Sequence, residues 1–238
     1  MFGLFKKITR GGSPHELIGK NRSICKGIDQ TKALSEYNFV VFDTELTGLK
    51  QKKDEIISIG AVRIKDLQID LGDTFHQYIR PERLDHTKAT LVHRITPEQL
   101  REAPKLEEVL PAFFSYIGSD VLVGHYIGLD MSFLQKATEK LFNGTLANPC
   151  IDTLRIAQGY KRAMLGYQDE NTPSADSYTL KDLSRELNLP IFDAHDALED
   201  AMQTAYLFLF LIKKFRQGGL VTLRDLYHAG RVTNFRVF

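Results

Sequence analysis

The 238-residue sequence contains no tryptophan and only two cysteines, Cys25 and Cys150. Two cysteines are too few for a disulfide framework or a cysteine-rich zinc site. The first residues contain no apolar segment long enough for a signal peptide. The apolar run from Leu207 to Ile212 falls far short of the ~20 residues that span a bilayer. We therefore expect a cytoplasmic protein in a reducing compartment, with no membrane partner.

The chain as a whole also lacks an excess of either charge, because 31 Lys and Arg are balanced by 30 Asp and Glu. Residues 1–35 hold seven of the basic residues against Glu16 and Asp29, which leaves the rest of the chain net acidic. A net acidic body needs a metal ion at its site to bind a polyanion, and the basic arm would help by attracting phosphate. A solvated chain terminus is the alternative explanation of the arm.

A predicted strand that leads into two carboxylates is the most informative stretch. Residues 39–42 are four consecutive apolar residues, as is typical of a central strand covered on both faces. Asp43 and Glu45 lie two residues apart, so both side chains point to the same side of an extended chain. Carboxylates at the end of a buried strand are costly without a positive partner, and a hard cation such as Mg²⁺ prefers oxygen ligands.

A second acidic position follows a short predicted strand that ends at His125. Asp130 lies five residues further on, where a helix is predicted to begin. Considered alone, an acidic residue at this position is explained by its favourable interaction with the positive N-terminal end of the helix dipole, without a catalytic role. Asp152, after another short strand, is interpreted as a cap of the next helix.

The third segment contains His195 and Asp200, which lie five residues apart. On one regular helix their directions would differ by about 140°, so they could not both face one site. Asp196 and Glu199 have the spacing of a capping box, which predicts that the helix starts at Asp196. His195 then lies just outside the helix, and Asp200 lies in its first turn.

The order of predicted elements indicates one α/β domain. The first three strands are joined by short links, as in an antiparallel meander, and strands and helices then alternate. Strands are expected at 39–42, 55–64, 74–79, 121–124 and 150–154, and helices after 97 and at 129–141, 180–187 and 196–215. Residues 165–178 are expected to form a loop. We divide the chain into a basic arm (1–35), the domain (36–216) and a tail (217–238).

Together the three segments resemble a known family. Phe42-Asp43-Thr44-Glu45-Leu46-Thr47-Gly48 resembles the first motif of the DEDD exonucleases, the group that contains the proofreading (epsilon) subunit of bacterial DNA polymerase III. The segments 124–134 and 193–201 resemble the second and third motifs, and the histidine of the third identifies the DEDDh branch. The resemblance covers about residues 37–214 and implies a ribonuclease H-like fold, a mixed five-stranded sheet flanked by helices. The sequence departs from the family at Leu46, usually Thr, and at Tyr126, normally Asn.

The resemblance also implies roles for the acids and the histidine. Asp43, Glu45 and Asp200 would hold the first of two Mg²⁺ or Mn²⁺ ions. Asp43 would bridge to the second ion, which Asp130 would support. His195 would accept the proton of the attacking water, since histidine ordinarily changes charge near working pH.

The implied reaction is the hydrolysis of DNA from its 3′ end with release of 5′-mononucleotides. The implied partners are a single-stranded DNA 3′ end and a DNA polymerase for which the protein would proofread. Residues expected to contact the substrate are Thr44, Leu46, Thr47 and His125, with Leu46 as an apolar wedge or platform.

Three other functions stay open. Oligoribonucleases of the same superfamily carry an apolar residue at the position of Leu46, which makes an RNA 3′–5′ exonuclease the first alternative. A non-catalytic, nucleic-acid-binding polymerase accessory module is the second, although all five expected catalytic positions are filled. A metal-dependent phosphatase acting on small molecules is a distant third.

Overall fold

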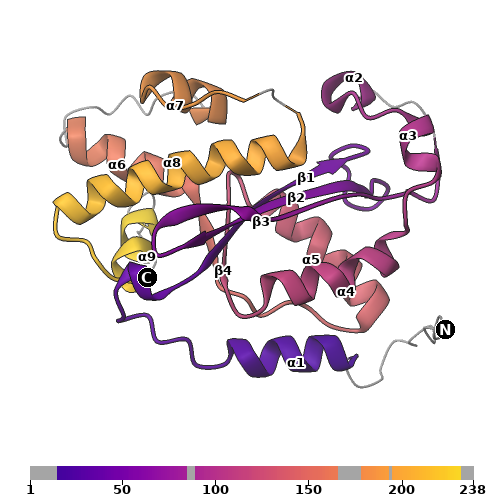
Figure 1. Cartoon of the computed structure of the whole chain (residues 1–238), viewed down its shortest axis with the longest axis horizontal. Coiled ribbons are helices and arrows are strands. Elements are labelled where there is room, and N and C mark those ends of the chain that lie inside the picture. The colour runs from indigo at the N-terminus through magenta and orange to yellow at the C-terminus, as the bar shows by residue number, and fades with distance from the viewer. Residues whose placement is uncertain (1–14, 85–88, 166–177, 193–194, 232–238) are drawn as a thin grey trace.

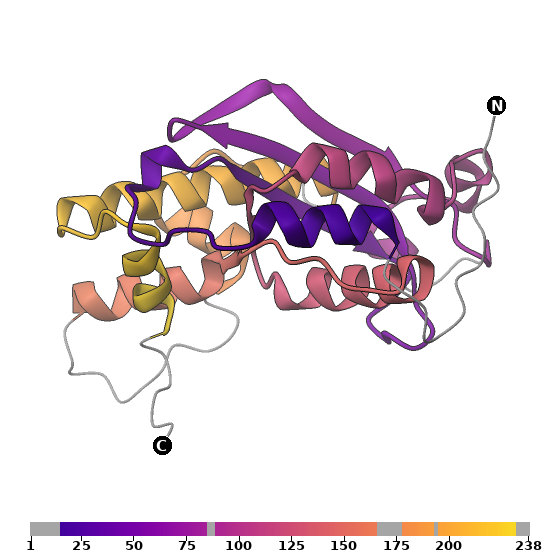
Figure 2. The same cartoon turned by 90° about the horizontal axis from the view of Figure 1, so that it is seen from below.

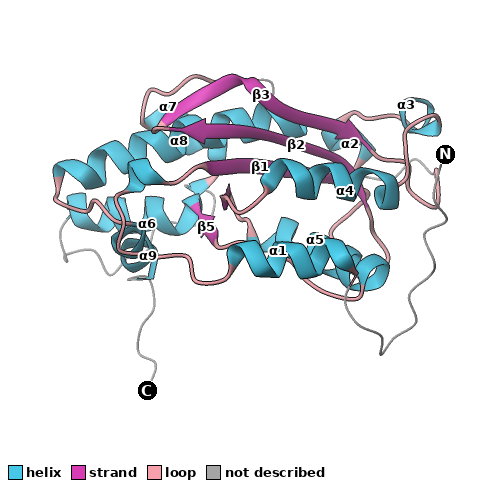
Figure 3. Cartoon of the chain, turned by 60° about the horizontal axis from the view of Figure 1, so that its bottom comes forward, coloured by secondary structure: helices cyan, strands magenta, loops and turns pink. Residues whose placement is uncertain are grey.

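A mixed five-stranded sheet with the strand order β3-β2-β1-β4-β5 forms the centre of the computed structural model (Figure 3). The structure describes residues 15–84, 89–165, 178–192 and 195–231. The β1–β2 and β2–β3 pairs are antiparallel, and β4 runs parallel to both β1 and β5. The predicted mixed sheet is therefore confirmed. The strands are β1 (Phe39–Leu46), β2 (Ile56–Lys65), β3 (Gln68–Tyr78), β4 (Val121–Gly124) and β5 (Cys150–Asp152).

Helices cover both faces of the sheet (Figure 1). One face packs against α6 (Thr153–Leu165), α7 (Leu180–Glu186), α8 (Ala197–Gln217) and α9 (Leu223–Arg231). The other packs against α1 (Glu16–Cys25), α4 (Leu106–Ile117) and α5 (Gly128–Phe142). Three short elements complete the described part of the chain: the 3₁₀ turn η1 (Leu34–Glu36), α2 (Thr90–His93) and α3 (Pro97–Arg101).

The alternation of side chains along β1 decides which layer receives the two carboxylates. Phe39 and Val41 pack in the core beneath α8, and the rings of Phe39 and Phe208 lie 5.1 Å apart. Val40 and Phe42 face the α4 and α5 side. Burial of one such side chain contributes about 1.5–3 kcal/mol, so a slip of one residue would exchange both faces at a large cost. Asp43 and Glu45 consequently continue the α8 face.

Two predicted boundaries differ from the structure. The sequence indicated only a basic arm over residues 1–35 and assigned no helix to it, but α1 forms within it and Ile18 is fully buried. Its burial depends on tertiary contacts, such as the 2.6 Å hydrogen bond from Asn21 Nδ2 to Asn148 Oδ1. Strand β3 begins at Gln68 rather than at 74. Its first four residues alternate polar and apolar side chains, but Gly72 and Asp73 interrupt this alternation before residue 74, so the sequence pattern signals only the second half of the strand.

The segments that flank the predicted domain pack onto it. Viewed from below, α1 lies beside α4, and the His15 N–H donates to the Phe142 carbonyl at the end of α5 at 2.9 Å (Figure 2). Near the other end of the chain, α9 packs against α6, and the Arg224 N–H donates to the Gln30 carbonyl at 2.8 Å. The division at 35/36 and 216/217 stays a prediction. Most of the predicted 165–178 loop lies outside the described residues.

Candidate active site

Three of the predicted carboxylates meet at the end of β1. Asp43 and Glu45 come from β1, and Asp200 comes from the first turn of α8. One oxygen of each carboxylate lies within 4.8 Å of the corresponding oxygens of the other two. Because β1 directs Asp43 and Glu45 toward α8, residues separated by more than 150 positions share one site.

The start of α8 is fixed by the cap that the sequence predicts. Asp196 is the N-cap, and its Oδ1 accepts hydrogen bonds from the Leu198 and Glu199 N–H groups at 3.0 and 3.2 Å. His195 lies outside the helix with φ 76°, and its side chain is exposed. Its backbone N–H donates to Asp200 Oδ2 at 3.0 Å. The predicted arrangement of His195 before the helix and Asp200 within it is confirmed.

Asp130, the fourth carboxylate, is held beside this cluster by β1 itself. It lies in the first turn of α5 and is 5% exposed. Asp130 Oδ1 accepts hydrogen bonds from the Thr44 N–H at 3.1 Å and from the Thr44 hydroxyl. Its negative charge raises the pKa of Asp43, second only to burial as a cause. Asp130 therefore neighbours the cluster while being anchored through Thr44.

The electrostatics of the cluster favour a bound cation. Burial, followed by the charge of Asp200, raises the pKa of Glu45 to about 8. Burial raises the pKa of Asp43 well above its usual range, and it also raises the pKa of Asp200. Among the described residues, no ion pair reaches these three carboxylates. Half-buried like charges at this spacing need protons or a cation, and three oxygen donors suit a divalent metal.

Three predicted substrate contacts lie along the end of β1. Thr44 is 8% exposed and holds Asp130. Leu46 is 7% exposed and packs in the core on the α4 and α5 side. The hydroxyl of Thr47 accepts a hydrogen bond from the Glu55 N–H at 3.0 Å. Each side chain has a structural partner, and its contact with substrate stays a prediction.

His125, the fourth predicted contact, has protein partners at both ring nitrogens. Nδ1 lies 2.9 Å from the Thr153 hydroxyl, and Nε2 lies 2.8 Å from the Tyr178 carbonyl. Burial lowers the pKa of His125 to about 4, although the bond to Tyr178 opposes the shift. The ring thus links β4 to α6 and to Tyr178, two residues before the start of α7, and its contact with substrate also stays a prediction.

The lowered pKa of His125 predicts a loss of stability in acid. Below pH 6.5 the unfolded chain binds a proton at this ring that the folded chain does not bind until about pH 4. The free energy of unfolding should therefore fall by about 3 kcal/mol from this residue as the pH drops from 7 to 4. Urea unfolding of the wild type and His125→Gln in chelator measures it. An identical pH dependence in both proteins would contradict the assignment.

The sequence that forms this site matches a known protein family. The chain matches the family described as Exonuclease (RNase_T) over residues 40–208. The chain belongs to this exonuclease family. The match includes all five positions that were expected to be catalytic, so the family indicated by the three motifs is confirmed. An exonuclease is a hydrolase of nucleic acid, and the acidic cluster agrees with the divalent metal chemistry of such enzymes.

Large polymerases are among the relatives of this exonuclease, and its fold resembles those of solved nucleases. It is 31% identical over 210 residues to a PolC-type DNA polymerase III of Thermotoga petrophila, covering 88% of this chain and 14% of the polymerase. The fold resembles exonuclease X in complex with 5′ overhanging duplex DNA, with a TM-score of 0.58, 22% identity, and coverage of 81% and 99% of the two chains. It also resembles a zinc-bound complex of E. coli exonuclease I with single-stranded DNA, with a TM-score of 0.61, 20% identity, and coverage of 79% and 42%.

Two further residues of the exonuclease lie near its site. His93 is 5% exposed, and its Nδ1 accepts a hydrogen bond from the Ile95 N–H at 3.1 Å, while its Nε2 has no hydrogen-bond partner within the described residues. Burial lowers the pKa of His93, and the charge of His195 lowers it further, so the two histidines are neighbours. Asp152 Oδ1 accepts from the N–H groups of Tyr126 and Leu154, which confirms its structural role. Sequence spacing gave no signal that His93 approaches His195.

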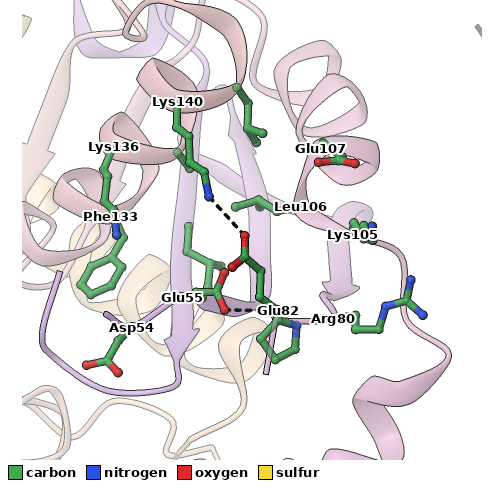
Figure 4. Close-up of a pocket in the computed structure, with 14 residues that line it drawn as sticks. Asp54, Glu55, Arg80, Glu82, Lys105, Leu106, Glu107, Phe133, Lys136 and Lys140 are labelled. Atoms are coloured by element: carbon green, nitrogen blue, oxygen red, sulfur yellow. Dashed lines mark hydrogen bonds and ion pairs between the residues drawn. The ribbon is translucent and has the colours of Figure 1, made fainter. Parts of the chain in front are cut away.

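A pocket of about 180 Å³ lies between the N-terminal end of α4, α5 and the start of β2 (Figure 4). Across it, Lys140 Nζ forms an ion pair with Glu82 at 3.3 Å, and the Glu82 N–H donates to Glu55 Oε2 at 2.9 Å. Of the described residues that line this pocket, none belongs to the carboxylate cluster. The pocket is therefore separate from the site of the exonuclease.

Across the described part of the chain, no helix is long and apolar enough to cross a membrane. The cytoplasmic location stays a prediction.

Proposed function

We propose that this chain is a divalent-metal-dependent 3′–5′ exonuclease that hydrolyses DNA and releases 5′-mononucleotides. The convergence of Asp43, Glu45 and Asp200 at the end of β1, with Asp130 anchored beside them, carries the proposal. The relatives with related folds that are described as bound to DNA, exonuclease X and exonuclease I, support DNA as the substrate.

The carboxylates and His195 would have different roles in the reaction. Asp43, Glu45 and Asp200 would hold Mg²⁺ or Mn²⁺, with Asp130 supporting a second ion. Such ions, when bound, activate water and stabilise the oxygens of an in-line displacement. His195 is exposed, so its ring can accept the proton of the nucleophile, while its backbone stays anchored to Asp200.

Exposed apolar side chains next to the carboxylates suit a single-stranded end. Leu49, in the turn after β1, is 75% exposed, and Tyr126 and Leu129, on either side of the start of α5, are 41% and 40% exposed. Unpaired bases stack on an aromatic ring such as that of Tyr126 without sequence preference, at about 1–3 kcal/mol per base, and the two leucines offer apolar contact surface. We infer that they hold the 3′-terminal nucleotides while the carboxylates face the terminal phosphodiester.

Degradation of end-labelled oligonucleotides tests the proposal. A 3′ label should leave at once as a mononucleotide, a 5′ label should yield a ladder of shortened strands, and both reactions should stop with EDTA. Single-stranded DNA, duplex DNA and matched RNA are compared, and Asp43→Asn is the inactive control. Faster degradation of RNA than of DNA would favour the RNA 3′–5′ exonuclease. No release of nucleotide in Mg²⁺ or Mn²⁺ would favour the non-catalytic polymerase accessory module.

The turn after β1 is expected to bind substrate phosphates. Lys52 and Lys53 are exposed, and the turn is fastened to α5 by a 2.7 Å hydrogen bond from Gln51 Nε2 to the Ser132 carbonyl. Replacing both lysines by alanine should raise KM for oligonucleotides about 3–10-fold. It should also lower the slope of log affinity against log salt concentration by about 1.4, because each of the two phosphate contacts contributes about 0.7 on a single strand.

Unchanged kcat in that double variant would show that the chemistry is intact. The matched control is Lys213→Ala with Lys214→Ala, two exposed lysines near the other end of α8. Equal KM in the wild type and the Lys52 and Lys53 variant would contradict the assignment of the turn.

A DNA polymerase is the partner that we propose for proofreading. The chain spans 14% of the length of the PolC-type polymerase that it matches, so in that relative the matching segment is part of a much larger protein. Faster removal of mismatched than of matched 3′ ends, and a further increase with the polymerase of the same organism, would support proofreading. Equal rates under all these conditions would support an enzyme that acts alone.

A further inference from the structure

Gly60 lies where the sheet and α8 come closest. It faces Asp43 across the β1–β2 ladder and His76 across the β2–β3 ladder. A Cβ at Gly60 would lie 2.1 Å from the Leu198 nitrogen, 2.2 Å from the Ala197 carbonyl carbon and 2.4 Å from its oxygen. These are backbone atoms of the first turn of α8, so no rotation of a side chain can relieve the contact.

The same turn carries Asp200, three residues after Ala197 and about 4.5 Å further along the helix axis. To bring a Cβ at position 60 even to 3.0 Å from the Leu198 nitrogen, the helix start would have to move by at least 0.9 Å. Metal–ligand distances tolerate only about ±0.2 Å. A side chain at position 60 would therefore displace a carboxylate by several times what metal coordination accepts.

Packing leaves α8 one way to relieve such a contact. Ala197, Ala201 and Ala205 are fully buried against the sheet, and Phe208 fixes the helix further along. The cap at Asp196 keeps the first turn intact. The helix start would thus lift away from β1 and β2 as a unit and carry Asp200 with it.

We propose that Gly60 is a positioning residue of the metal site, because the lack of a side chain there sets how closely Asp200 approaches Asp43 and Glu45. This inference rests on the proposed metal-dependent function. A residue that has no side chain would thus determine the distances between the three carboxylates, on which metal coordination depends.

Titration of Gly60→Ala with Mn²⁺, measured by isothermal calorimetry, tests this inference. Its Kd for Mn²⁺ should rise by about 10–100-fold, as for other changes that misplace a ligand. Gly159→Ala is the matched control, because a Cβ there would lie 2.5 Å from the Ala229 carbonyl oxygen, between α6 and α9 and away from the carboxylates. This variant should lose thermal stability while each folded molecule binds Mn²⁺ like the wild type.

Lengthening the side chain at position 200 gives a second test. Asp200→Glu adds one C–C bond of about 1.5 Å, so in the wild-type background it should weaken Mn²⁺ binding by at least about tenfold. In the Gly60→Ala background the longer side chain should recover part of the lost affinity. If Gly60→Ala folds poorly, the titration is made in trimethylamine N-oxide, which favours the folded state.

The outcomes separate this inference from the proposed function. Wild-type affinity in folded Gly60→Ala, equal weakening in both glycine variants, or wild-type affinity in Asp200→Glu would each overturn the role of Gly60. A wild-type protein that binds no Mn²⁺ would instead overturn the metal site itself, and with it this inference.

Discussion

Replacing Asp43 by Asn is expected to abolish metal binding and to reduce exonuclease activity by at least about 10³-fold, the scale of losing a charge-stabilising group. Asp43 is central to the cluster, since it shares the α8 face with Glu45 and its pKa is raised by burial and then by the charges of Asp130 and Asp200. Asn keeps the shape of the side chain but removes the negative charge that a divalent cation requires. Calorimetric titration with Mn²⁺ and release of labelled nucleotide measure the two losses.

The same substitution should stabilise the metal-free protein. Because burial raises the pKa of Asp43, folding at pH 7 requires either a charged carboxylate in a crowded site or the uptake of a proton. The unfolded chain binds no such proton above its usual pKa, so this contribution to stability falls as the pH rises. Asn avoids both costs, and we expect a gain of about 1–2 kcal/mol in the free energy of unfolding, with loss of the thermal shift that metal produces.

Asp70→Asn is the control for both effects, since Asp70 lies on the edge strand β3 and pairs with Lys65 at 3.0 Å. It should leave Mn²⁺ affinity and activity unchanged. Strong Mn²⁺ binding by Asp43→Asn would refute the ligand assignment. A metal-free variant less stable than the wild type would refute the account of crowded charge.

Local rules were sufficient to predict how the acidic residues are presented. The period of two along β1 places Asp43 and Glu45 on one face, and the N-cap at Asp196 leaves His195 outside the helix. Both follow from residues within a few positions of one another. That the end of β1 and the start of α8 lie together was inferred from the family resemblance. The hydrophobic periodicity of a helix does not show which strand it packs against.

The features that sequence reasoning missed depend on contacts between distant segments. The bond from Thr44 to Asp130 joins residues 86 positions apart. The role of Gly60 depends on the backbone of α8, and a glycine within a predicted strand gives no indication of what approaches it. Helix α1 was missed for the same reason, since the burial of Ile18 is created by α4 and α5.

The replacement of His195 by Ala is expected to lower kcat by about 10²–10⁴-fold, the usual contribution of a general base. Affinity for Mn²⁺ should stay at the wild-type value, because Asp200 is held by the backbone N–H of His195, which Ala retains. The acid limb of the pH–rate profile, which reports the essential base, should disappear. This separation of turnover from metal binding distinguishes His195 from Asp43, whose replacement should remove both.

Two other histidines serve as controls for His195. His228 is exposed on α9, so His228→Ala should change neither kcat nor metal affinity. His93 is the nearby ring that could act instead, because its buried Nε2 has no hydrogen-bond partner within the described residues. If His93→Gln removes the acid limb while His195→Ala keeps it, the proton acceptor is His93. Loss of Mn²⁺ binding in His195→Ala would show that the ring, rather than its backbone, supports the carboxylates.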